Sequence, residues 1–318
     1  MKKWNCLLII ITLSVFCLSG CSHKKNMELQ EIQNDEKRLG VEDETPSPET
    51  ALETPEAEEK TKRKITKVDW SEYFHGLKGA AVVYDVSDGK YMVYNSKLAS
   101  KRRSPCSTFK IISSLIGLEK GVIPYGNSVR NWSGEVFWNE NWNKDIDFQD
   151  AFSTSCVWYF RQVIDDIGEN TMQEELNRLQ YGNCDISDWK GKLNTNNNNR
   201  ALTGFWIESS LKISAKEQVD VMERIFEKQA AYKPKTLRFL NKVMKVTDQG
   251  NLPIPFYGKT GMGKKDNIVV DAWFTGFAKG SHGNIYFCVY LGRCDGMNVS
   301  SSIAKEIAIH IISDYYNH

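Results

Sequence analysis

Strand-like segments lie near both ends of the folded part of this chain, and the segment between them is mostly helical. Residues 79–86 and 91–94 are strand-like, and the Asp88-Gly89 pair between them is a hairpin signal. Three further strands are predicted over residues 257–261, 272–278 and 285–291. The pattern predicts an α+β fold, in which a central antiparallel sheet built from both chain ends is flanked by helices and carries an inserted, mostly helical subdomain.

Helical spacing of apolar residues supports the inserted subdomain. A single helical stripe is predicted through Phe148, Phe152, Cys156, Phe160 and Val163. Further helices are expected around Met172 to Leu179, after the capping box Ser214–Glu217, and along the stripe Ile303, Ile307 and Ile311.

A serine and a lysine occupy the first turn of another predicted helix. Pro105 precedes Ser107, and apolar residues then recur at helical spacing until Gly121. Residues three apart share a helix face, so the Lys110 amine can approach the Ser107 hydroxyl. The helix N-terminus adds unpaired N–H groups that suit a developing oxyanion. Taken alone, the stretch is also explained by an ordinary capping serine beside a solvated lysine.

Three downstream tripeptides favour the chemical interpretation. They follow in the order Ser155-Cys156-Val157, Tyr181-Gly182-Asn183 and Lys259-Thr260-Gly261. A lone Ser-x-x-Lys arises often by chance, whereas the ordered set indicates a serine acyl-enzyme site with Ser107 as the nucleophile.

The nucleophile needs a base, and an ordinary lysine is protonated at neutral pH. Burial can depress the pKa of the Lys110 amine, or the neutral amine can react with carbon dioxide to give a carbamate. Apolar residues beside the motifs favour the carbamate, because Phe109, Val157 and the segment Phe205-Trp206-Ile207 predict a dry pocket with one indole N–H donor. The simpler interpretation of Trp206 is a half-buried core aromatic.

The motifs together resemble those of the class D, or oxacillinase-type, serine β-lactamases. The resemblance covers roughly residues 66–318 and includes Trp273-Phe-Thr-Gly276 and the segment 205–214. It implies the serine β-lactamase and penicillin-binding fold, and hydrolysis of penicillin-type β-lactams that gives resistance to them. It further implies that CO₂ or bicarbonate carboxylates Lys110, and that no metal or organic cofactor takes part.

The resemblance also implies a role for each matching residue. Ser107 is the nucleophile, carboxylated Lys110 the general base, Trp206 its support, with Val157 in the apolar wall, and Ser155 passes a proton to the leaving nitrogen. Lys259, Thr260 and Gly261 bind the substrate carboxylate, the N–H groups of Ser107 and Met262 form the oxyanion hole, and Tyr181 and Asn183 line the groove.

One position departs from the family pattern. Class D enzymes usually carry a carboxylate-binding arginine shortly before the terminal helix, where this chain reads Met297-Asn-Val-Ser-Ser-Ser-Ile. Arg293 lies slightly earlier and could substitute for that arginine, but the sequence does not give the direction of its side chain. We therefore expect Thr260 and serine hydroxyls to carry more of the contact.

Three other functions compete with this hypothesis. A D,D-transpeptidase or carboxypeptidase shares the serine and Lys-Thr-Gly motifs, but usually has asparagine where Val157 stands. A β-lactam sensor acylates without turnover. Sensors of this kind carry several membrane helices and a zinc protease, whereas this chain has one apolar run and no His-Glu-x-x-His. A binding lipoprotein with an inactive site is disfavoured by four intact motifs.

The N-terminus predicts export. Residues 1–21 combine Lys2 and Lys3 with an apolar run too short to span a bilayer. Leu18-Ser-Gly-Cys21 resembles a bacterial lipoprotein cleavage box, which implies a lipid on Cys21; the alternative is an ordinary secretory signal. Residues 22–65 are acidic, contain prolines and hold few large apolar groups, so they predict a flexible tether. An extracytoplasmic catalytic domain over residues 66–318, held at the membrane, follows.

Net charge and cysteine spacing give no support for binding of nucleic acid or zinc. A net charge of +1 gives no basic excess for nucleic acid. Of the eight cysteines, five lie outside the signal region, an odd number whose spacings match no zinc pattern. The sequence leaves open whether Cys288 and Cys294 are bridged, and it leaves the oligomeric state open.

Overall fold

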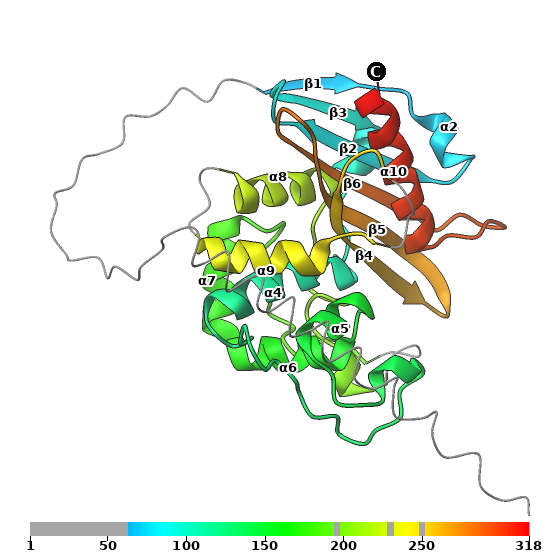
Figure 1. Cartoon of the computed structure of the whole chain (residues 1–318). Helices are drawn as coiled ribbons and strands as arrows, with labels where there is room; N and C mark the ends of the chain where they lie inside the picture. The colour runs from blue at the N-terminus through cyan, green and yellow to red at the C-terminus, as the bar shows by residue number, and fades with distance from the viewer. Residues whose placement is uncertain (1–62, 194–197, 228–231, 248–251, 318) are drawn as a thin grey trace, which may run out of the picture. The chain divides into compact units, whose positions relative to one another are not determined.

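A six-stranded sheet runs through the computed structural model, which describes residues 63–193, 198–227, 232–247 and 252–317. The strands are β1 (Lys64–Lys67), β2 (Gly79–Asp85), β3 (Lys90–Tyr94), β4 (Phe256–Lys265), β5 (Ile268–Lys279) and β6 (Asn284–Gly292). Their order across the sheet is β1-β3-β2-β6-β5-β4 (Figure 1). All neighbours are antiparallel except β1 and β3. Because β2 pairs with β6, the two chain ends form one sheet, as the sequence predicts.

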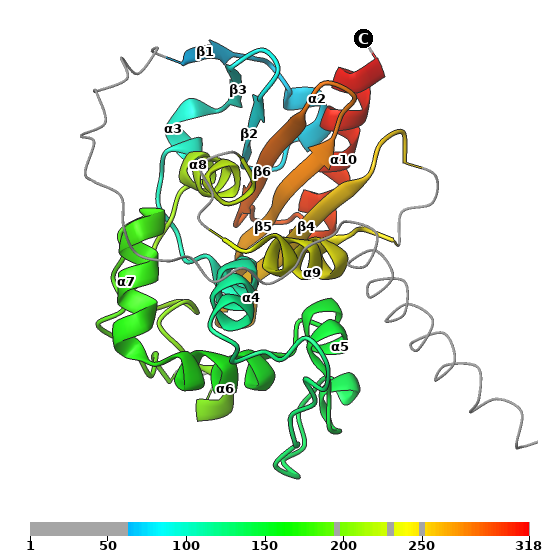
Figure 2. The ribbon, with the colours of Figure 1, turned by 60° about the vertical axis from the view of Figure 1, so that its left-hand side comes forward.

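Alternate residues of the strands separate two apolar cores. In β2, Ala80 and Val82 face the core on the helical side, whereas Ala81 and Val83 face the core under the terminal helix. The terminal helix α10 (Ser301–Asn317) packs on β4, β5 and β6, while α8 (Ala215–Phe226) packs on β2, β5 and β6 (Figure 2). The sheet is therefore buried on both faces.

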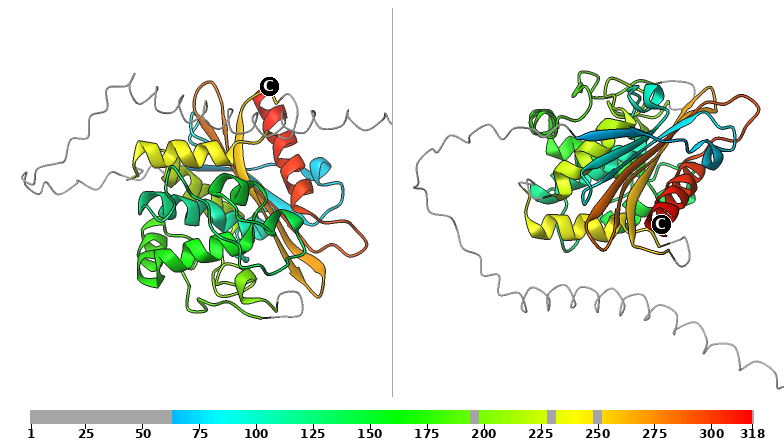
Figure 3. Two further views of the ribbon diagram at one scale, coloured as in Figure 1. Left: turned by 60° about the horizontal axis from the view of Figure 1, so that its bottom comes forward. Right: turned by 90° about the horizontal axis from the view of Figure 1, so that it is seen from above.

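The inserted helices gather on the α8 side of the sheet (Figure 3). They are α4 (Lys110–Glu119), α5 (Phe148–Ser153), α6 (Val157–Ile167), α7 (Glu169–Leu179) and α9 (Pro234–Met244). Shorter elements are α2 (Ser71–Phe74), α3 (Ser96–Ala99), η1 (Cys106–Phe109), η2 (Glu140–Trp142) and η3 (Arg200–Leu202). The helix α4 lies at the centre, since it contacts η1, α6 and α9. The predicted capping box of Ser214 and Glu217 opens α8.

The course of the chain differs from the sequence prediction in two places. The single stripe predicted from Phe148 to Val163 is wrong, because Ser155 has a left-handed backbone (φ 58°) that ends α5 and redirects the chain into α6. The folded domain also begins before the predicted boundary at residue 66. Arg63 forms an ion pair with Glu223 of α8 at 2.6 Å, and β1 starts at Lys64.

The predicted signal peptide, Cys21 and nearly all of the predicted tether lie outside the described residues. Within the described ranges, no helix combines the length and apolar character needed to cross a bilayer. The five cysteines there, Cys288 and Cys294 included, are free thiols.

Candidate active site

The Ser107 hydroxyl and the Lys110 amine meet at the junction of η1 and α4. Lys110 Nζ donates to Ser107 Oγ at 2.9 Å, as the spacing of three predicts. The lysine is only 1% exposed, and burial lowers the pKa of its amine to about 8. Its electrostatic neighbours are the thiols of Cys156 and Cys106. Burial thus supplies a partly neutral amine beside the nucleophile near neutral pH.

Strand β4 lies against η1 because Gly261 has no side chain. A Cβ there would come within 2.9 Å of both the Pro105 carbonyl oxygen and Thr108 Cγ2. Cys106, directly before the nucleophile, holds a left-handed backbone (φ 50°), which is unusual for a residue other than glycine. The Lys-Thr-Gly strand and the nucleophile are therefore brought together by close backbone packing.

The helices on either side of the Ser155 turn contact both Lys110 and Lys259. Phe160, one turn into α6, places its ring 5.5 Å from Lys110 Nζ, and Phe152, at the end of α5, places its ring 5.8 Å from Lys259 Nζ. Cys156 is fully buried, whereas Ser155 and Val157 are half-buried. The structure therefore brings the Ser155 motif to the same place as Ser107, Lys110 and Lys259.

Lys259 is a second buried amine. Burial, the Lys110 amine and Lys305 together lower its pKa well below its usual value. Its Nζ donates to the carbonyl oxygen of Thr260 at 3.3 Å. Thr260 is half-buried and Met262 is 39% exposed on the sheet's edge strand. A basic group with a hydroxyl next to it is thus available to an anion at the strand edge.

Trp206 is fully buried, and its indole N–H finds no hydrogen-bond partner within the described part of the chain. The ring stacks on Phe109, the residue before Lys110, with centroids 6.1 Å apart. Gly204 permits this placement, since a Cβ there would lie 1.9 Å from the indole. A buried donor without a partner costs free energy, so it marks a place where a ligand group fits.

Ser104 links the segment around Trp206 to the nucleophile and to the sheet through hydrogen bonds. Its hydroxyl donates to the Trp206 carbonyl oxygen at 3.0 Å and accepts from the Glu208 N–H at 2.8 Å. Its carbonyl oxygen accepts from the Trp273 indole at 3.1 Å. The Cys106 N–H also donates to the Trp206 carbonyl oxygen at 3.0 Å. These bonds fix the relative positions of Trp206 and Ser107.

The third motif has a different place from the one predicted. Tyr181 is fully buried and meets the Phe109 ring edge to face, with centroids 5.5 Å apart, so it packs behind Phe109 and does not line a groove. Asn183 donates to the Ser210 carbonyl oxygen at 2.9 Å and accepts from the Lys212 N–H at 2.8 Å. Its polar groups are thus used to hold the segment that follows Trp206.

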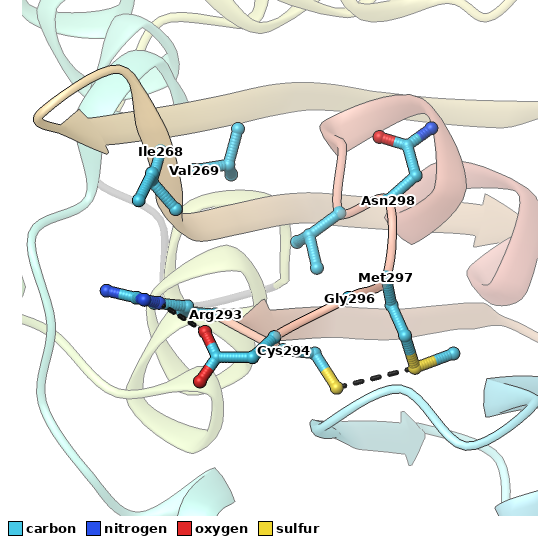
Figure 4. Close-up of a pocket in the computed structure, with 9 residues that line it drawn as sticks. Ile268, Val269, Arg293, Cys294, Gly296, Met297 and Asn298 are labelled. Carbon is cyan, nitrogen blue, oxygen red and sulfur yellow. Dashed lines mark hydrogen bonds and ion pairs between the residues drawn. The ribbon is translucent and has the colours of Figure 1, made fainter.

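Arg293 does not take the place of the missing arginine. Its guanidinium pairs with Asp295 at 2.7 Å and lines a surface pocket of ≈ 280 Å³ between residues 268–269 and 293–299 (Figure 4). None of the residues that line this pocket belongs to the four motifs.

The arrangement fits the penicillin binding protein transpeptidase domain, whose family matches residues 79–313. The chain belongs to this family. The probable β-lactamase YbxI of Bacillus subtilis is 30% identical over 251 residues, which cover 79% of this chain and 86% of that protein. The crystal structure of a class D β-lactamase from Bacillus subtilis is 29% identical and superposes with a TM-score of 0.67, covering 79% of this chain and 96% of that chain. The resemblance to class D β-lactamases is thereby confirmed, together with the fold.

A regulatory protein matches the same part of this chain. The regulatory protein BlaR1 of Staphylococcus aureus is 32% identical over 247 residues, which are 76% of this chain but 40% of that protein. The chain thus spans less than half of BlaR1. The family holds both enzymes and regulators.

Sequence reasoning missed the thiols of Cys106 and Cys156 as neighbours of Lys110, and it missed Ser104. The thiols lie beside motif residues, and this adjacency was the only available signal. Ser104 contacts the Trp206 carbonyl oxygen and the Trp273 indole, which lie 102 and 169 residues later in the chain. No local sequence pattern predicts contacts over such distances along the chain.

Proposed function

We propose that this penicillin-binding domain is a β-lactamase, which hydrolyses penicillin-type β-lactams through an acyl-enzyme on Ser107 and so gives resistance to them. The observation that carries the proposal is the 2.9 Å contact between Ser107 Oγ and the buried amine of Lys110, whose pKa is lowered to about 8. A nucleophile needs a base with an unprotonated fraction at working pH, and burial gives the Lys110 amine such a fraction.

Acylation begins when Ser107 Oγ attacks the lactam carbonyl carbon and its proton passes to the base at position 110. The N–H groups of Ser107 and Met262 stabilise the oxyanion. The Ser155 hydroxyl passes a proton to the lactam nitrogen as the carbon–nitrogen bond breaks. The lysine of β4 attracts the substrate carboxylate, and Thr260 supplies the hydroxyl beside it.

Carbon dioxide, bound as a carbamate on Lys110, supplies a carboxylate-type base for both acylation and deacylation. The residues fit this group, because Lys110 offers a partly neutral amine in a dry pocket and Trp206 offers a buried N–H without a partner. Phe109 and Phe160 exclude water from the amine, and the half-buried Val157 adds no competing charge.

A second candidate is a β-lactam sensor that is acylated on Ser107 and not hydrolysed. The 32% identity to BlaR1 of Staphylococcus aureus favours it. The two candidates share the first half of the reaction and differ in deacylation. A transpeptidase is disfavoured by Val157, where asparagine is usual.

The test is a single-turnover experiment with a chromogenic penicillin, followed by mass spectrometry of the intact protein. The β-lactamase proposal predicts a Ser107 adduct that disappears within seconds, and repeated turnover. An adduct that persists for hours would support the sensor and refute the enzyme.

We also infer that the chain is exported and lipidated on Cys21, which tethers it to the membrane of a bacterial cell. The support is the Leu18-Ser-Gly-Cys21 sequence behind a basic and apolar N-terminus. Cys21→Ser should release the protein from the membrane fraction. Unchanged membrane association of that variant would refute the anchor.

A further inference from the structure

Arg161 of α6 is a nearly buried cation in contact with two indole rings. Its guanidinium carbon lies 5.2 Å from the centroid of Trp189 and 5.1 Å from the centroid of Trp206. The residue is 7% exposed. A cation at this distance from an indole is attracted by the negative face of the ring, and more strongly when both groups are shielded from water.

The direction of the guanidinium is fixed by its other partners. Arg161 forms a two-pronged ion pair with Asp165, one turn along α6, in which Nε donates at 3.0 Å. It also donates to the Trp189 carbonyl oxygen at 3.0 Å. The Trp189 indole N–H in turn donates to Asp165 at 3.2 Å. Arg161, Asp165 and Trp189 thus form one closed polar cluster, which we name the Arg161 clamp.

The clamp reaches the site through aromatic contacts. Trp189 stacks on Phe205 with centroids 5.1 Å apart, and Phe205 meets Trp206 edge to face at 5.2 Å. Trp206 is therefore held directly by the Arg161 guanidinium and indirectly through Phe205.

The restraint on Trp206 matters because the orientation of the ring decides where its unpaired N–H points. A buried donor without a partner costs free energy, so an unrestrained indole would gain by turning toward an acceptor. Packing on Phe109 and Phe205, together with the cation of the Arg161 clamp, holds the ring in the orientation that leaves its N–H available.

We propose that Arg161 is a positioning residue, which holds the Trp206 indole with its N–H available to the carbamate on Lys110. This inference rests on the proposed function. It predicts that Arg161 sets the affinity of the site for carbon dioxide without touching the substrate. Loss of the guanidinium should therefore raise the bicarbonate requirement and leave kcat nearly unchanged once bicarbonate is saturating.

The experiment titrates the full chain with ¹³C-bicarbonate. It measures the ¹³C carbamate resonance and, separately, turnover of a chromogenic penicillin. Arg161→Met, which keeps the side-chain length and removes the charge, should raise the half-saturating bicarbonate concentration about tenfold for both readouts, which corresponds to ~1.4 kcal/mol. Arg161→Lys should give a smaller shift, because it keeps the charge and loses the planar fork.

Arg178→Met is the matched control. Arg178 likewise pairs with an acid, Glu175, and lies 4.4 Å from the Tyr232 ring, but it contacts none of the proposed catalytic groups. Its bicarbonate requirement should equal that of the wild type. If Arg161→Met does not fold, Asp165→Ala removes the anchor of the guanidinium from a half-exposed position and should shift the requirement in the same direction.

The outcomes separate the two proposals. If the wild type gives a carbamate signal that Trp206→Phe abolishes, and the folded Arg161 or Asp165 variant titrates like the wild type, the positioning role is refuted and the proposed function stands. If the wild type gives no carbamate signal and turns over without bicarbonate, the carbamate chemistry is refuted together with the role of Arg161.

Discussion

Replacing Lys110 with methionine should stabilise the protein while abolishing its activity. Burial lowers the pKa of the Lys110 amine from 10.5 to about 8. The unfolded chain therefore binds this proton more tightly than the folded chain, and protonation favours unfolding at every pH below 10.5. The difference amounts to about 3 kcal/mol at pH 7 and falls to about 1 kcal/mol at pH 10. Methionine fills a similar volume and carries no charge.

The methionine side chain lacks the hydrogen bond that Lys110 donates to Ser107, and this loss offsets about 1 kcal/mol of the gain. We therefore expect Lys110→Met to raise the free energy of unfolding by about 2 kcal/mol at pH 7 and by about 0 kcal/mol at pH 10 in bicarbonate-free buffer. The assay is urea unfolding at both pH values. Lys120→Met, at an exposed lysine just after α4, is the control and should change stability by about 0.5 kcal/mol or less.

Bicarbonate provides a second arm of the same assay. Under the carbamate proposal it binds the folded wild type and should raise its stability with concentration, but it should leave Lys110→Met unchanged. A Lys110→Met variant that is less stable than the wild type at pH 7, or a difference that does not vary with pH, would refute the reasoning that Lys110 is a destabilised, partly neutral amine.

Four further predictions follow from the site. Gly261→Ala should lower kcat/KM about 100-fold, because its Cβ meets the Pro105 carbonyl oxygen at 2.9 Å and pushes β4 from the nucleophile; Gly126→Ala, whose Cβ meets nothing within 4 Å, should have no effect. Val157→Asp should lower the deacylation rate about 100-fold or more, because a carboxylate there pairs with Lys110 and keeps it protonated, whereas Val157→Thr should retain turnover; stopped-flow and mass spectrometry separate the two. In bicarbonate-free buffer, kcat/KM should fall as pH decreases through about 8, since protonation of Lys110 removes the base, and a flat profile between about pH 6 and 9 would contradict this. Arg293→Ala should change KM for penicillins less than about twofold, because its guanidinium is paired with Asp295 away from the site; a strong rise in KM would restore Arg293 as the carboxylate partner.

The sequence predicts an element of this fold correctly where local residue spacing alone determines it. The hairpin of β2 and β3, the capped start of α8 and the approach of Lys110 to Ser107 all follow from local spacing. The break at Ser155 was not readable, because the apolar period continues across it and only its left-handed backbone ends the helix. The turn at Ser155 is packed against segments distant in sequence, since Phe152 and Phe160 beside it contact Lys259 and Lys110.

Long-range contacts also explain the remaining errors and omissions. Tyr181 stands in a motif that the family resemblance assigns to the groove, yet packing on Phe109 buries it completely. Arg161 carries no sequence signal, since it lies on an apolar helix stripe and finds its aromatic partners 28 and 45 residues later. Residue type is the basis of the proposed chemistry, and tertiary packing decides which side chains reach the site.

The most direct test of the central claim is turnover of a chromogenic penicillin by the purified full chain near neutral pH, with and without added bicarbonate, with mass spectrometry of the protein at each time point. A carbamate-dependent β-lactamase should turn over rapidly, with stimulation by bicarbonate and without accumulation of a Ser107 adduct. A stable Ser107 adduct with negligible turnover at saturating bicarbonate would contradict it and identify the domain as a penicillin sensor.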